Sequence, residues 1–145
     1  MNKRKNTTRK NSTNFRIYYD DVSVNGQQLT RLQTKNIPRI HFKSKKDKYY
    51  TIVIYDLHSP KPAYIHFLAI NVTDPLVIRP TIEYQPPSPP PSDTHYHVYM
   101  IELYEQPGFL TIGSRSRIGF DPVMFSKMNK LYKIAQRGFY VNPKI

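Results

Sequence analysis

The chain has 145 residues, with 22 Lys and Arg against 10 Asp and Glu, and it contains no cysteine. This length suffices for one domain with one core, and the missing cysteines exclude disulfides, zinc–thiolate sites and cysteine nucleophiles and fit a reducing compartment. No apolar stretch approaches the roughly 20 residues needed to cross a bilayer, and the N-terminus lacks the apolar segment of a secretion signal. We therefore expect a cytoplasmic protein that is not secreted.

The positive charge is concentrated in the N-terminal third. Residues 1–48 hold 13 basic and 3 acidic side chains, a net charge of +10, whereas residues 49–145 hold 9 and 7, a net charge of +2. Residues 1–14 have no apolar period and are predicted to be a disordered basic tail, with a single domain over residues 15–145. Residues 43–48 are predicted to form an exposed hairpin loop. These segments either provide solubility or attract an anionic surface such as phospholipid headgroups, nucleic acid or an acidic partner.

Three segments have the pattern of β-strands. In Tyr49–Tyr55, residues 50, 52 and 54 fall on one face and residues 49, 51, 53 and 55 on the other, with β-branched and aromatic side chains throughout. The segment 65–72 is apolar on both faces, as in a strand covered on both sides, and 98–104 is the third strand. Prolines clustered at 60–62 and 86–91 break the chain between these strands and exclude long helices there.

One helix is predicted, from Pro122 to Ala135. Asp121 can cap this helix with Pro122 in the first turn, and apolar side chains follow at helical spacing at positions 125, 128, 131 and 132. Short strands separated by turns, with one late helix, indicate a mainly β fold. We expect a β-sandwich with one short C-terminal helix.

Four polar side chains lie near the ends of the apolar strands: Asp56, His66, His97 and Tyr99. Residues two apart on a strand face the same side, so His97 and Tyr99 project together. The same rule places His66 on the face of residues 68 and 70, and Asp56 on the face of residues 52 and 54. Imidazole N–H and phenol O–H donors suit an anion such as phosphate, and a carboxylate can fix the tautomer of an imidazole and raise its pKa. The pattern predicts a small anion pocket.

Two other chemistries compete with anion binding. His95 and His97 are two residues apart and, together with His66 and Asp56, could instead bind zinc. Catalytic motifs are missing, since there is no Gly-x-Ser-x-Gly, no phosphate-binding glycine loop and no pair of carboxylates, and Ser59 precedes a proline in a turn. We predict a non-enzymatic binding protein that uses no cofactor and no metal.

Two regions carry a longer motif. The first is the turn 56–60 (DLHSP) followed by the strand 64–71 (YIHFLAIN), and the second is a Pro-Pro pair at 90–91 followed by HYHVY at 95–99 and a strand that ends in YEQ at 104–106. They resemble the two signatures of the phosphatidylethanolamine-binding protein family, which includes Raf kinase inhibitor protein. The segment 22–42 is similar to the region that precedes them in that family. The resemblance covers about residues 16–142.

The resemblance implies an anion site that binds phosphate-type groups. The residues at the matching positions are Asp56, His66, Pro91, His97 and Tyr99. The rim of this site is expected to hold His58, Pro60 and His95.

The chain departs from the family pattern around the site. His58 stands where the family has the second aspartate of the turn, Pro89, Asp93 and His95 replace glycines that flank the second signature, and Val98 replaces an arginine. An imidazole in place of a carboxylate makes the rim more basic, which favours an anion, while prolines stiffen the loop and narrow the mouth. The family's usual C-terminal helix has no counterpart here, so we expect one side of the pocket to be more open.

Two functions follow from these observations. The first is a binding protein for a phosphate-bearing ligand, either a phospholipid headgroup of the phosphatidylethanolamine type or a phosphorylated partner. The resemblance extends this function to the regulation of a protein kinase. The second is a basic structural protein that associates with nucleic acid through its N-terminal third and has a vestigial pocket. The chain's length and Asn/Lys-rich start are similar to family members encoded by large DNA viruses, so the virion is the alternative location. Truncation of residues 1–14 discriminates between the two functions, because only nucleic-acid binding depends on the tail.

Overall fold

The structure of the chain is a computed structural model that describes residues 13–59, 63–90, 92–93 and 95–143. Within these residues, strands form a three-stranded sheet in the order β2-β1-β4 and a five-stranded sheet in the order β3-β8-β7-β5-β6. The strands are β1 (Arg16–Tyr19), β2 (Val22–Ser23), β3 (Gln28–Leu29), β4 (Arg39–His41), β5 (Tyr50–Asp56), β6 (Tyr64–Val72), β7 (His97–Glu105) and β8 (Tyr132–Val141). Neighbouring strands run antiparallel, except that β3 pairs with β8 in parallel. The predicted mainly β fold is confirmed.

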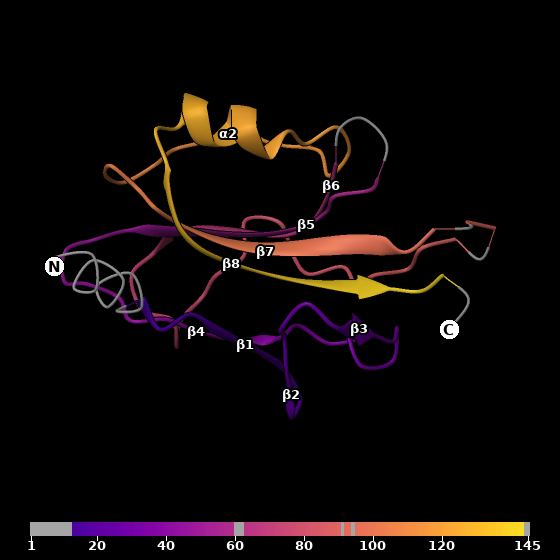
Figure 1. The fold of residues 1–145 in the computed structure, drawn as a ribbon. Helices are drawn as coiled ribbons and strands as arrows, with labels where there is room; N and C mark the ends of the chain where they lie inside the picture. The colour runs from indigo at the N-terminus through magenta and orange to yellow at the C-terminus, as the bar shows by residue number, and fades with distance from the viewer. Residues whose placement is uncertain (1–12, 60–62, 91, 94, 144–145) are drawn as a thin grey trace, which may run out of the picture.

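The large sheet is covered on both faces. Figure 1 shows the small sheet below it and α2 (Pro122–Met128) above it. The core between the sheets takes Ile52 and Ile54 from β5, and the core beneath α2 takes Val53 and Tyr55 from the same strand. The predicted alternation of this strand is therefore correct, and both of its faces are buried because each faces another layer.

The core beneath α2 contains a buried carboxylate. Glu102 of β7 is 2% exposed and accepts hydrogen bonds from the hydroxyls of Tyr55 and Tyr104, the first at 2.8 Å. The ammonium of Lys133 lies 3.3 Å from the same carboxylate. These three donors compensate the carboxylate for the water it loses on burial.

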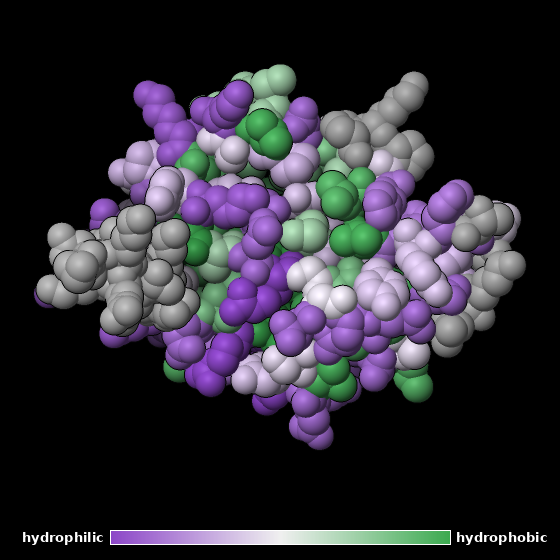
Figure 2. All heavy atoms as spheres, in the orientation of Figure 1, coloured by the Kyte–Doolittle hydropathy of each residue, from purple (hydrophilic) through white to green (hydrophobic). Residues whose placement is uncertain are grey.

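The helix is shorter than the sequence predicts. Its N-terminus is as expected, since the Asp121 carboxylate accepts hydrogen bonds from the amides of residues 123 and 124 at 3.0 and 3.1 Å. It ends at Met128, with Asn129 as its C-cap and Lys130 at a φ of 53°. The prediction of a helix as far as Ala135 was wrong, because the chain from Tyr132 onward forms β8 and pairs with β7. Apolar side chains of α2 are exposed at positions 123, 124 and 128. Figure 2 shows apolar spheres among hydrophilic ones at the top of the molecule, where Figure 1 places this helix.

The basic N-terminal region follows the sequence prediction in part. The lysines at 43, 45, 46 and 48 are exposed as expected. The loop that holds them is not a hairpin, however, because it connects β4 of the small sheet to β5 of the large sheet. Residues 1–12 of the predicted tail lie outside the described residues.

Two residues of the matched motifs join strand ends through side-chain hydrogen bonds. The amide of Gln106 donates to the side-chain oxygen of Asn71 at 2.9 Å and to the carbonyl of Gly108 at 2.9 Å. Its oxygen accepts from the Thr51 hydroxyl at 2.7 Å and from the backbone amide of Asn71 at 2.8 Å. Since Gln106 is 4% exposed and its polar atoms are bonded within the fold, its role is structural.

Candidate anion site

The large sheet brings the predicted residues together at one end. Asp56, the last residue of β5, pairs directly with Tyr99 of β7, and His97 begins the same strand two residues earlier. Paired residues and residues two apart share a face of a sheet, so all three point toward the core between the sheets. The rings of His97 and Tyr99 stack with their centroids 6.4 Å apart, so the two side chains project together, as the sequence predicts.

His66 reaches the same place by a β-bulge. Ile54 of β5 pairs with Phe67 and Tyr55 pairs with Ile65, so His66 is the extra residue of β6 at this register shift. A bulge turns two successive side chains toward one side of a sheet. The expectation that His66 shares a face with Leu68 was therefore wrong: Leu68 packs beneath α2, whereas the His66 ring lies 5.2 Å from the ring of Tyr99.

His97 lies between two carboxylates. Its Nδ1 is 2.6 Å from Oδ2 of Asp56, and its Nε2 is 2.5 Å from Oδ2 of Asp93. Ionised carboxylates only accept hydrogen bonds, so this geometry requires a proton on both ring nitrogens. Burial alone would lower the pKa of His97, but the hydrogen bonds to Asp56 and Asp93 outweigh it and raise the pKa. The arrangement thus favours the imidazolium form.

His66 has the opposite protonation preference. Burial lowers its pKa, and the hydrogen bond between its Nδ1 and the carbonyl of Gln85, at 2.5 Å, opposes this effect without cancelling it. Because a carbonyl can only accept, Nδ1 carries the proton of the neutral ring. The two histidines of the cluster therefore differ, since His97 is favoured as a cation and His66 as a neutral donor and acceptor.

Tyr99 brings a phenol to the cluster. Its side chain is 1% exposed and stacks against the rings of His97 and Phe139. Burial, reinforced by the charge of Asp56, raises the pKa of Tyr99 well above its usual value. The hydroxyl therefore keeps its proton and remains able to donate to an anion.

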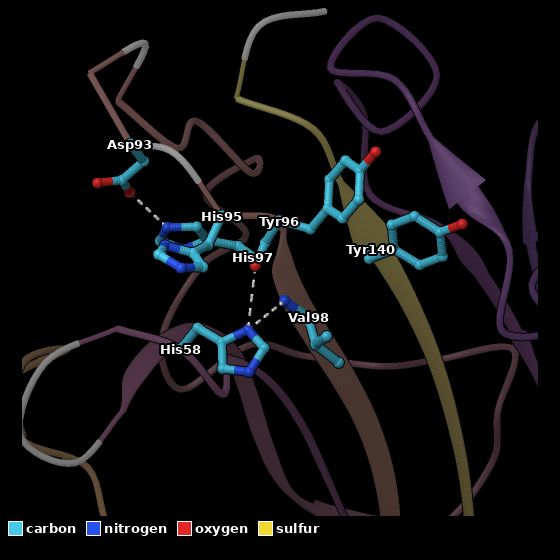
Figure 3. Close-up of a pocket in the computed structure, with 7 residues that line it drawn as sticks. All are labelled: His58, Asp93, His95, Tyr96, His97, Val98 and Tyr140. Atoms are coloured by element: carbon cyan, nitrogen blue, oxygen red, sulfur yellow. Dashed lines mark hydrogen bonds and ion pairs between the residues drawn. The ribbon is translucent and has the colours of Figure 1, made fainter.

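An open cavity of about 750 Å³ lies beside this cluster, over His97. Figure 3 shows its lining residues, which come from the turn after β5, the loop before β7, and the paired strands β7 and β8. They are His58, Asp93, His95, Tyr96, His97, Val98 and Tyr140. Asp56, His66 and Tyr99 do not line the cavity and are buried next to it, at 5%, 4% and 1% exposure. His97 is the residue that the predicted cluster and the cavity share.

The structure describes only part of the predicted rim of the site. His58 and His95 are exposed and line the cavity, as expected. Nδ1 of His58 lies 3.2 Å from the carbonyl of Tyr96 and 3.1 Å from the amide of Val98, and since one nitrogen cannot donate and accept together, only one of these bonds is made at a time. Pro60 and Pro91 lie outside the described residues.

The zinc alternative lacks support from the geometry. His95 lies in a bend before β7 and not on the strand, so the spacing rule for two imidazoles on one face does not apply to it. Among the described residues, no group of three or more histidine or acidic side chains is placed to hold a metal ion.

Asp93 is one of three site residues that the motifs do not identify. It is a departure from a glycine of the family pattern, and nothing local indicates that a loop carboxylate will reach His97. The one sequence signal is an acidic side chain four residues before His97. Tyr96 and Tyr140, whose rings are 5.1 Å apart on the cavity wall, were also not anticipated.

The fold and the cluster define a β-sandwich protein with imidazole, phenol and carboxylate groups gathered at the strand ends. The family model described as phosphatidylethanolamine-binding protein matches residues 19–138. The chain belongs to the phosphatidylethanolamine-binding protein family, as the motifs predict.

Solved structures agree with this assignment. The crystal structure of a phosphatidylethanolamine-binding protein from Plasmodium falciparum matches with a TM-score of 0.67 and 16% identity, over 88% of this chain and 84% of that one. A putative homologue from Chlamydia trachomatis matches with a TM-score of 0.58 and 17% identity, over 87% of this chain and 95% of that one. At these identities the two structures establish the shared fold. In addition, no helix among the described residues has the length and apolar character needed to span a membrane.

Proposed function

We propose that the chain binds a phosphate-bearing ligand, without catalysing a reaction, where the cavity meets His97. The observation that carries this proposal is the convergence of two histidines and a tyrosine, from strands β6 and β7 of the large sheet, next to an open cavity. Phosphate oxygens are strong acceptors, and these side chains offer N–H and O–H donors. Membership of a family named for phosphatidylethanolamine supports this ligand class.

Each residue has a distinct role in this proposal. His97, hydrogen-bonded to Asp56 on its buried side, lines the cavity and supplies a cationic N–H. Tyr99 is buried beside His97, stacks against its ring and keeps its O–H protonated. His66, fixed through its bond to Gln85, lines the deep end of the cluster. The apolar and aromatic wall of the cavity is suited to the remainder of the ligand, which is either the glycerol part of a phospholipid or the side chain of a phosphorylated protein.

NMR titration tests the proposal. Inorganic phosphate and phosphoethanolamine are added at constant ionic strength to wild type, to His97→Gln and to a matched control, His41→Gln. His41 lies on β4 of the small sheet, against Tyr18 and away from the cavity. Saturable shifts in wild type and the control that disappear in His97→Gln support the site. No saturable shifts in wild type, or equal shifts in all three proteins, would refute it.

A further inference from the structure

His97 has no hydrogen-bond donor left for a ligand. An imidazolium has two N–H groups, and here one points to Asp56 at 2.6 Å and the other to Asp93 at 2.5 Å. The Asp93 carboxylate therefore stands on the side of His97 that faces the cavity, where a phosphate oxygen would otherwise accept the proton (Figure 3).

The two carboxylates are held very differently. The side chain of Asp56 is 8% exposed, belongs to a central strand and also accepts a bond from the amide of His58 at 2.9 Å. The side chain of Asp93 is 39% exposed, belongs to the loop before β7 and has His97 as its hydrogen-bond partner. Releasing Asp93 into water costs little, because a half-exposed carboxylate regains its hydration. Asp56 is thus a fixed part of the site, and Asp93 is displaceable.

From this geometry we infer that Asp93 is an internal anion that competes with the phosphate group of a ligand for Nε2 of His97. The inference rests on the proposed function and names the residue that sets the affinity of the site for a phosphate group. Binding exchanges one anion for another at His97.

The charges around His97 agree with such an exchange. Asp56 faces it from β5, Asp93 and His95 from the loop, His58 from the turn after β5, His66 from β6 and Tyr99 from its own strand. With Asp93 in place, two carboxylates surround one imidazolium, which disfavours a further anion. With Asp93 displaced, the remaining pair is neutral and a phosphate adds to it without that repulsion.

The test compares wild type, Asp93→Asn and Asp93→Gly with the control Asp47→Asn, an exposed aspartate in the loop before β5. Inorganic phosphate binding is measured by NMR at constant ionic strength, and the pKa of His97 is measured without ligand. We expect both Asp93 variants to bind phosphate about tenfold more tightly than wild type and to titrate at a lower His97 pKa. The control should match wild type in both measurements.

The outcomes separate the inference from the proposed function. If wild type binds phosphate through His97 and the Asp93 variants bind it equally well, the competition is refuted and the proposed function stands. An unchanged His97 pKa in Asp93→Asn would also overturn the inference, because the contact would then be absent in solution. If neither wild type nor the Asp93 variants bind phosphate up to about 10 mM, the proposed function fails and the competition fails with it.

Discussion

Replacing Asp56 by asparagine should change how His97 titrates and how stability depends on pH. Asp56 accepts two hydrogen bonds, from Nδ1 of His97 at 2.6 Å and from the amide of His58 at 2.9 Å. Asparagine has nearly the same shape, but it is neutral, and one of its two polar atoms can only donate. The variant therefore removes the charge while it preserves the packing.

The size of the effect follows from the hydrogen bond between Asp56 and His97. A hydrogen bond to a charged group contributes about 1.5–3 kcal/mol, and about 1.4 kcal/mol corresponds to one pKa unit. The pKa of His97 should thus fall by about one to two units in Asp56→Asn. The free energy of unfolding should decrease by about 1–3 kcal/mol near pH 6, out of a total of about 5–15 kcal/mol for a domain.

The pH dependence has a definite sign. The pKa of His97 is raised in the folded protein, so its stabilising contribution is complete below the ordinary histidine pKa of about 6.5 and is lost as the pH rises through the folded pKa. The difference in stability between wild type and Asp56→Asn should therefore be largest near pH 5.5–6 and shrink toward about pH 8.5. Asp56 also raises the pKa of His66 electrostatically, against the larger effect of burial, so its replacement lowers that pKa further and adds to the stability difference at the acid end.

Urea unfolding between about pH 5.5 and 8.5, with NMR titration of the His97 ring, measures both quantities. The matched control is Asp74→Asn, which replaces an exposed aspartate that accepts a bond from the amide of Leu76. The reasoning fails if His97 titrates at the same pH in wild type and Asp56→Asn, or if the stability difference does not vary with pH.

Three further predictions concern the fold and the second histidine. Gln106→Leu removes four buried hydrogen bonds at about 1 kcal/mol each, so urea unfolding should show a loss of about 3–4 kcal/mol; a loss below about 1 kcal/mol would contradict the structural role of Gln106. Glu102→Ala leaves two buried tyrosine hydroxyls without their acceptor and should cost about 2–4 kcal/mol in the same assay, and an unchanged midpoint would show that the carboxylate is not needed. The pKa of His66 is lowered, so its contribution is present above about pH 6.5 and lost as the pH falls; His66→Gln should flatten that acid-side loss, and an unaltered pH profile would count against the assigned protonation.

The sequence by itself determined where the main strands lie and which residues form the polar cluster. Alternation along Tyr49–Tyr55 predicted which side chains enter which core, because a strand has a fixed period of two and each face of this one is covered by another layer. The motif matches predicted the family and placed Asp56, His97 and Tyr99 side by side. These features are local, or they follow from motifs whose residues occur in the expected order along the chain.

Other features depend on which strands lie next to each other, and only the tertiary structure decided them. Only the apolar positions 131 and 132 extend the helical spacing beyond residue 128, too few to fix a helix, and pairing with β7 selected a strand. A register shift against β5, which no periodicity within β6 reveals, turned His66 toward Tyr99. The contact between Asp93 and His97 depends on how a loop folds back over a strand end. Each outcome was set by contacts with another part of the chain, and those contacts outweigh the weak local preferences of a short segment.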